Sequence, residues 1–84
     1  MTVKRLLVME QPQIGKLIRG LRLEIGLTQE QFAAELGVTY STINRWENGR
    51  SKPSPLAVQK IEGILRRLGA RSQNFLVKYF PEQG

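Results

Sequence analysis

Cysteine and histidine are both missing from this 84-residue chain, and the sequence contains no aspartate. Without cysteine, the chain can form neither a disulfide framework nor a thiolate metal site. The absence of histidine and aspartate also removes the commonest metal ligands and general bases. We therefore expect no metal, no cofactor and no catalytic residues, and the chain is not expected to be an enzyme.

Long apolar stretches are lacking as well. No run of about 20 apolar residues is present to span a bilayer. The basic and apolar stretch at residues 4–9 is too short for a secretion signal, and Glu10 follows it at once. We therefore expect the protein to be cytoplasmic and to have no membrane partner.

Positive charge is in excess, because 13 lysine and arginine residues stand against 7 acidic ones and give a formal net charge of +6. Such a balance favours a polyanionic partner, either nucleic acid or an anionic membrane surface. Charge alone does not choose between these two. The length suits one small domain with a modest core, so we expect a single domain to carry the function.

The most informative pattern consists of two short helices joined by a glycine turn. Thr28 and Gln31 have the spacing of a capping box, in which each side chain satisfies a backbone donor at a helix N-terminus. Gly37 tolerates the positive φ that ends this helix, and Thr39 is a suitable N-cap for the next one. These signals predict a helix-turn-helix motif over residues 29–48, which mostly serves to lay its second helix in the major groove of DNA.

The second helix of the motif has two distinct sides. Ile43 and Trp46 stand three residues apart, which predicts that both are buried. Trp46 is therefore interpreted as a core residue and not as an aromatic that stacks on bases, and Phe32 in the first helix is interpreted likewise. Asn48 and Gly49 end the second helix after about two turns. Its polar side is a compact cluster: Tyr40, Ser41, Thr42, Asn44 and Arg45.

Helices on both sides of the motif complete an all-α fold. Apolar residues at three-and-four spacing predict a helix that starts at Pro12 and ends before Gly26. After the motif, Ser54 and Pro55 have the pattern of an N-cap and a first helical residue, and Gly69 ends the helix that they begin. The predicted fold is a compact bundle of four to five helices.

The two ends of the chain allow more than one interpretation. Residues 1–11 are assigned to an N-terminal arm, which is flexible, forms a strand or contacts a partner. Residues 12–69 are assigned to the domain itself. Residues 70–84 are assigned to a tail or a short fifth helix capped by Ser72, although residues 74–80 are also β-prone. The helix is favoured, with three side chains facing inward: Phe75, Leu76 and Tyr79.

From about Ile14 to Leu68 the chain resembles the phage repressor and Cro type of helix-turn-helix protein, the XRE family. The resemblance rests on short stretches at fixed spacings: Leu27-Thr28-Gln29, Phe32-Ala33, Leu36-Gly37-Val38, Ile43, and Trp46-Glu47-Asn48-Gly49. It implies the lambda-repressor-like fold and sequence-specific binding of double-stranded DNA, with the helix at residues 39–48 in the major groove. A transcriptional regulator of the Cro/C1 type, and specifically a repressor, is the function that the resemblance implies.

The resemblance also implies roles for individual residues. Four outward residues match positions that touch base edges: Tyr40, Ser41, Asn44 and Arg45. Among them, Arg45 suits O6 and N7 of guanine, and Asn44 suits adenine. Six residues match or resemble positions near the DNA backbone: Gln29, Thr42, Asn48, Arg50, Lys52 and Arg19. Arg22 and Glu47 match a structural ion pair between two helices.

Basic residues of the later helices are interpreted more simply, as a solvated face: Lys60, Arg66, Arg67, Arg71 and Lys78. Two copies of the chain are expected to form a homodimer that binds half-sites about 34 Å apart. A second hypothesis is an antitoxin that binds a toxin through residues 3–8 and 75–80 and represses its own promoter. A third is a nucleic-acid or protein-interaction module without sequence preference.

Overall fold

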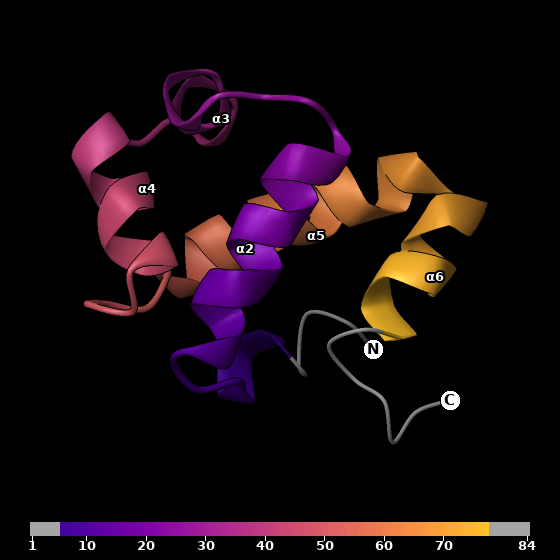
Figure 1. Cartoon of the computed structure of the whole chain (residues 1–84), viewed down its shortest axis with the longest axis horizontal. Coiled ribbons are helices and arrows are strands. Elements are labelled where there is room, and N and C mark those ends of the chain that lie inside the picture. The colour runs from indigo at the N-terminus through magenta and orange to yellow at the C-terminus, as the bar shows by residue number, and fades with distance from the viewer. Residues whose placement is uncertain (1–5, 78–84) are drawn as a thin grey trace.

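Five helices follow one another in the computed structural model, which describes residues 6–77 apart from the side chains of Gln73 and Leu76 (Figure 1). They are α2 (Gln13–Glu24), α3 (Gln29–Leu36), α4 (Tyr40–Glu47), α5 (Pro55–Leu68) and α6 (Ala70–Val77). A helical turn at residues 6–8 precedes α2, and no described residue is in a β-strand. The prediction of an all-α bundle is confirmed.

The helix boundaries lie where the capping residues predicted them. The Thr28 hydroxyl accepts the Gln31 backbone N–H at 3.1 Å, and the Gln31 side chain accepts the Thr28 backbone N–H at 2.9 Å. The capping box at the start of α3 is therefore complete. Thr39 and Ser54 also cap α4 and α5 with their side chains. Gly37 ends α3 with φ at 70°, a left-handed conformation that glycine adopts without strain.

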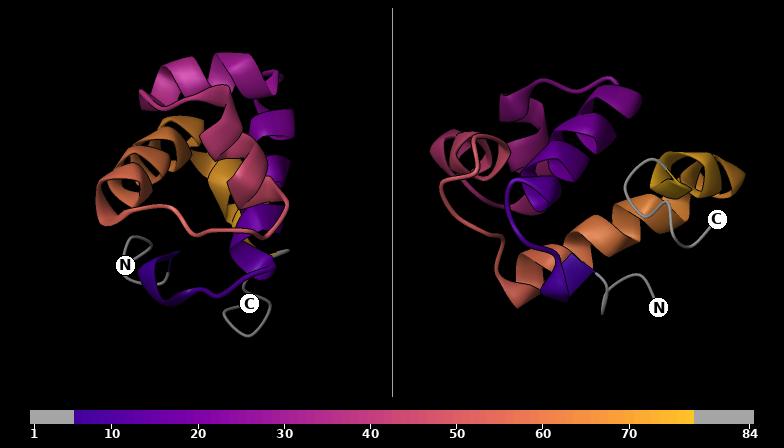
Figure 2. Two further views of the ribbon diagram at one scale, coloured as in Figure 1. Left: turned by 90° about the vertical axis from the view of Figure 1, so that its left-hand side faces the viewer. Right: turned by 60° about the horizontal axis from the view of Figure 1, so that its bottom comes forward.

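In Figure 1, α2 crosses in front of α5, with α3 at the top, α4 at the left and α6 at the right, where it follows the C-terminal end of α5 (Figures 1 and 2). Helix α4 packs against α2 and α3, whereas α5 packs against α3 and α6. One apolar core joins all these elements, and it contains Leu6, Ile14, Leu17, Ile18, Leu21, Phe32, Ala33, Leu36, Ile43, Trp46, Ala57, Val58, Ile61, Ile64, Leu65 and Phe75. Phe32 and Trp46 are thus core residues, as predicted. Within the described part of the chain, no helix is both long and apolar enough to cross a bilayer.

Near the C-terminus, helix α6 begins directly after Gly69, so Ser72 lies inside the helix and not at its cap. The Ser72 hydroxyl donates back to the Gly69 carbonyl at 2.8 Å. Residues 74–77 are helical, and the β alternative is wrong over that range. Phe75 is buried as predicted, whereas the side chain of Leu76, and both Lys78 and Tyr79, lie outside the described residues.

The N-terminal segment is joined to the domain from Leu6 onward. Leu6 is 1% exposed and belongs to the core, and residues 6–8 are helical, so the strand alternative is wrong there. Gln11 donates hydrogen bonds to the backbone of Trp46, at the end of α4, and of Ser51, in the loop after it. The sequence-based boundary between residues 11 and 12 therefore does not coincide with a structural break, and residues 1–5 lie outside the described range.

Candidate nucleic-acid interface

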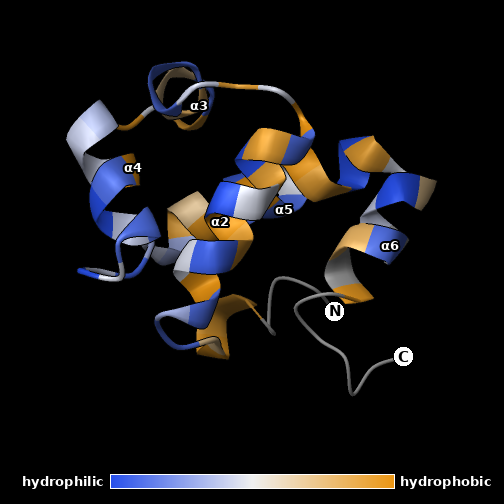
Figure 3. Ribbon diagram, viewed as in Figure 1, coloured by the Kyte–Doolittle hydropathy of each residue, from blue (hydrophilic) through white to orange (hydrophobic). Residues whose placement is uncertain are grey.

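Helix α4 turns one side into the core and presents the other to solvent. Ile43 is fully buried and Trp46 is 4% exposed. On the outer side, Tyr40 is 50% exposed, and Ser41 and Arg45 are exposed as well. Figure 3 shows that the polar residues of α4 and of the turn after it gather at one side of the molecule. Of the outward cluster predicted from the sequence, Tyr40, Ser41 and Arg45 are thus exposed, whereas Thr42 and Asn44 are partly buried.

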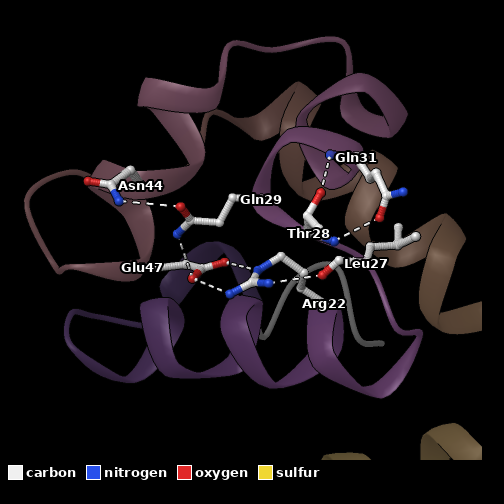
Figure 4. Close-up of polar contacts among 7 residues, drawn as sticks. All are labelled: Arg22, Leu27, Thr28, Gln29, Gln31, Asn44 and Glu47. Atoms are coloured by element: carbon white, nitrogen blue, oxygen red, sulfur yellow. Dashed lines mark hydrogen bonds and ion pairs between the residues drawn. The ribbon is translucent and has the colours of Figure 1, made fainter.

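The C-terminal end of α4 is joined to α2 by an ion pair. Arg22 Nε donates to Glu47 Oε2 at 2.7 Å, and Arg22 Nη2 donates to Oε1 of the same carboxylate at 3.1 Å. The two side chains are 11% and 4% exposed. Arg22 Nη1 also donates to the Leu27 carbonyl at 2.9 Å, which joins the α2–α3 turn to the pair (Figure 4). Such a bidentate, mostly buried pair fixes the angle at which α4 leaves the core.

A chain of side-chain amides continues from Glu47 toward the outer side of α4 (Figure 4). Gln29 Nε2 donates to Glu47 Oε1 at 3.0 Å, and Asn44 Nδ2 donates to Gln29 Oε1 over a long 3.4 Å. Asn48 Nδ2 in turn donates to Asn44 Oδ1 at 3.0 Å. Because a carboxylate can only accept, Glu47 sets the direction of every donor in this chain. One N–H and one lone pair of the Asn44 amide therefore remain for a further partner.

The other residues assigned to the DNA backbone lie around the same surface, but their surroundings differ. Thr42 is half-buried, and its hydroxyl lies 2.9 Å from the Thr39 hydroxyl, inside the N-terminal cap of α4. Arg19 on α2 and Arg50 in the loop after α4 are exposed. Lys52 Nζ lies 3.6 Å from Glu10 Oε1. Among the described residues, Arg19 and Arg50 thus have no acidic partner, whereas Lys52 has an acidic neighbour.

The basic side chains of α5 and α6 are exposed, but each of them has a polar partner. Arg66 pairs with Glu62, Arg67 with Glu35, and Arg71 with Glu24, at 2.9–3.4 Å. Lys60 Nζ donates to the carbonyl of Leu36 at the end of α3, 3.0 Å away. This face is therefore solvated, as expected, but its charges are paired with polar partners, and Lys78 lies outside the described residues. Within residues 6–77 the acidic side chains form no cluster that could hold a metal ion.

Gly15 is a residue of this region that the sequence did not indicate. A Cβ at this position would overlap the carbonyl oxygen of Trp46 and would come within 2.9 Å of Gln11 Oε1. Helices α2 and α4 approach so closely here that no side chain fits. The available signal was a glycine in a helix interior, which costs about 1 kcal/mol relative to alanine and so suggests a packing reason.

Comparisons with known proteins agree with this geometry. Residues 9–68 match a helix-turn-helix family. The chain belongs to this family. It is an XRE-type helix-turn-helix protein, and membership makes it a DNA-binding protein and not an enzyme, as the sequence predicted.

Two relatives are each similar to about two thirds of the chain. A protein of Methanothermobacter thermautotrophicus, named an HTH-type transcriptional regulator, is 47% identical over 51 residues, which are 61% of this chain and 74% of the relative. A protein of Yarrowia lipolytica, named a multi-protein-binding factor 1, is 33% identical over 55 residues, which are 66% of this chain. The match spans 36% of the Yarrowia protein. No solved structure matches the chain significantly.

Proposed function

We propose that this chain is a sequence-specific transcriptional regulator that binds double-stranded DNA and reads the major groove with α4. Family membership and the relative named a transcriptional regulator support a DNA-binding regulator. The observation that carries the sequence-specific part is the rigid mounting of α4. Its inner side is buried, its end is fixed by Arg22 and Glu47, and its outer side is polar and open.

Base reading falls to the outer side of α4 in this proposal. Arg45 is exposed and has no acidic partner in the described part of the chain, so its guanidinium is available for O6 and N7 of guanine. Asn44 offers one N–H and one lone pair, which together match N7 and N6 of adenine. The Ser41 hydroxyl can donate a hydrogen bond to a base or accept one from it. Tyr40 contacts sugar or a thymine methyl.

Backbone binding falls to the surrounding residues. Arg19, Arg50 and Lys52 neutralise phosphates, which supplies affinity without sequence information. Gln29 opens α3, where backbone N–H groups point outward, and its amide keeps one N–H beyond the bond to Glu47. Two further residues stand close to the same phosphates: Thr42 and Asn48.

The regulator acts as a homodimer in the cytoplasm and represses transcription. A two-fold axis would place two copies of α4 in successive major grooves, about 34 Å apart on one face of the duplex. Repression is favoured over activation because occlusion of polymerase needs no further surface.

An antitoxin remains the alternative, although the structure weakens the surface on which it relied. Leu6 and Phe75 are buried in the chain's own core and are not available to a toxin. Leu7, Val8 and Val77 stay 41%, 70% and 51% exposed. Co-purification of a second polypeptide that covers these three residues would favour the antitoxin.

Selection of a random double-stranded DNA library on the purified protein tests the proposal. At about 0.15 M salt, much of the long-range charge attraction is screened, so enrichment reports short-range contacts. The proposal predicts a palindrome whose half-sites are about one helical turn apart. Retention of DNA without any enriched sequence would contradict base reading by α4.

A further inference from the structure

Gln11 lies ahead of α2, but its side chain reaches the loop that follows α4. Its Nε2 donates to the carbonyl oxygen of Trp46 at 3.0 Å and to that of Ser51 at 2.6 Å. Its Oε1 accepts the backbone N–H of Gly15 at 2.9 Å. One amide therefore joins three backbone positions, of which Ser51 lies 40 residues along the chain from Gln11.

The orientation of this amide is fixed at both ends. Carbonyl oxygens only accept and a backbone N–H only donates, so Nε2 must face the loop and Oε1 must face α2. The side chain fits because Gly15 leaves room for it, since a Cβ there would lie 2.9 Å from Gln11 Oε1. Gln11 thus holds the end of α4 and the loop against α2.

The held loop, residues 48–52, carries two of the cations assigned to the DNA backbone, Arg50 and Lys52. Glu10, directly before Gln11, lies 3.6 Å from Lys52, with 78% of the Glu10 side chain and 39% of the Lys52 side chain exposed. A phosphate that approaches Lys52 therefore meets this carboxylate and competes with it for the ammonium group. Two neighbouring residues thus act on the same loop: Gln11 binds the loop's backbone, and Glu10 faces the charge of Lys52.

We infer that Glu10 and Gln11 form a clasp that controls how strongly the loop at residues 48–52 binds the DNA backbone, an inference that rests on the proposed function. Gln11 is a positioning residue: it orders the loop before DNA arrives, so less ordering entropy is lost on binding. Glu10 acts in the opposite direction, because it competes with phosphate for Lys52. Because the ion pair of Arg22 and Glu47 still holds α4 without the Gln11 amide, the clasp changes affinity for every sequence alike and leaves base preference unchanged.

Two substitutions separate these opposite effects. Gln11→Met keeps the length and neutrality of the side chain but removes all three hydrogen bonds. For each phosphate contact that is lost, affinity should fall about fivefold at 0.15 M salt, and the slope of log K against log salt should become shallower by about 0.9. Glu10→Gln should instead strengthen binding by about two- to fivefold, the range of an exposed ion pair. Gln13→Met, on an exposed neighbour of Gln11, is the matched control and should change neither quantity.

Binding is measured on a duplex carrying the selected site and on a random duplex, and the ratio between the two should stay constant in every variant. A folded Gln11→Met protein with an unchanged salt slope would overturn the positioning role. If Gln11→Met does not fold, Glu10→Gln decides, because its side chain is exposed: unchanged affinity would overturn the clasp.

Hydrogen exchange of the free protein gives a readout that needs no DNA. Exchange of the backbone amides at residues 49–52 should be faster in Gln11→Met and unchanged in Gln13→Met. Unchanged exchange in Gln11→Met would overturn the clasp even if the protein binds DNA. If wild-type protein binds no duplex, the proposed function fails, and the exchange data still decide whether Gln11 holds the loop.

Discussion

The half of the molecule formed by α2, α3 and α4 presents its positive charge differently from the half formed by α5 and α6. On α5 and α6, three arginines pair with carboxylates and Lys60 caps the end of α3. On α2, α4 and the loop after α4, four cations have no acidic partner among the described residues: Lys16, Arg19, Arg45 and Arg50. Arg22, in contrast, is mostly shielded from solvent in this half and is paired with Glu47.

This contrast shows why net charge alone does not locate a binding surface. Surface ion pairs contribute about 0–1 kcal/mol each to stability, but each of them cancels a charge that would otherwise attract phosphate. Among the described residues, the cations that remain unpaired are on α2, on α4 and in the loop after α4. Under the proposed function, the face that carries the unpaired cations is the one that binds DNA.

The largest expected effect compares the buried ion pair of the first half with an exposed pair of the second. Arg22→Met leaves the Glu47 carboxylate buried without its arginine, and it should lower the free energy of unfolding by about 3 kcal/mol. Arg67→Met removes an exposed pair with Glu35 and should cost less than about 1 kcal/mol. Urea denaturation of both variants measures the difference. Equal losses would show that the two pairs are equivalent and that Arg22 does not anchor α4.

A smaller effect compares two helical glycines, one from each half. Gly15→Ala should destabilise the protein by about 1–3 kcal/mol, because the methyl group overlaps the Trp46 carbonyl and forces α2 and α4 apart. Gly63→Ala meets nothing within 4 Å and should stabilise α5 by about 0.5–1 kcal/mol. Thermal unfolding checks both signs. A Gly15→Ala protein as stable as wild type would contradict the close contact between α2 and α4.

The smallest effect concerns DNA affinity at single unpaired and paired arginines. Arg19→Ala should weaken binding to all duplexes by about fivefold at 0.15 M salt, as expected for one lost phosphate contact. Arg71→Ala removes the same charge from α6 and should leave affinity nearly unchanged, because Arg71 already pairs with Glu24. Fluorescence anisotropy over a range of salt concentrations measures both. Equal losses would mean that overall charge, and not its pairing, governs binding.

Local signals in the sequence were sufficient to predict the helices and to tell the buried side of α4 from its exposed side. The capping box of Thr28 and Gln31, the caps at Thr39 and Ser54, and the burial of Trp46 all depend on residues within a few positions of one another. Such contacts form inside one helix or turn, so spacing predicts them. The start of α6 was displaced because Gly69 permits a new helix at once, without a side-chain cap.

The spacing of residues in the sequence does not predict the polar contacts between helices. The pair of Arg22 and Glu47 was expected from the family resemblance alone, and nothing in the sequence indicated that Gln29 and Asn44 would extend it. Gln11 was assigned to an arm, although its partners are Trp46 and Ser51. These contacts depend on how α2 crosses α4, which is a property of the packed core and not of any single segment.

The central claim is that α4 reads bases while the loop after it binds the backbone, and the most direct test compares Arg45→Ala with Arg50→Ala. Both residues are exposed arginines, so both variants lose the same charge. The ratio of affinities for the selected duplex and a random duplex should fall in Arg45→Ala by a factor that corresponds to about 1–3 kcal/mol, the value of one bidentate guanine contact. In Arg50→Ala this ratio should be unchanged while both affinities fall together. An unchanged ratio in Arg45→Ala would contradict the assignment of α4 as the reading helix.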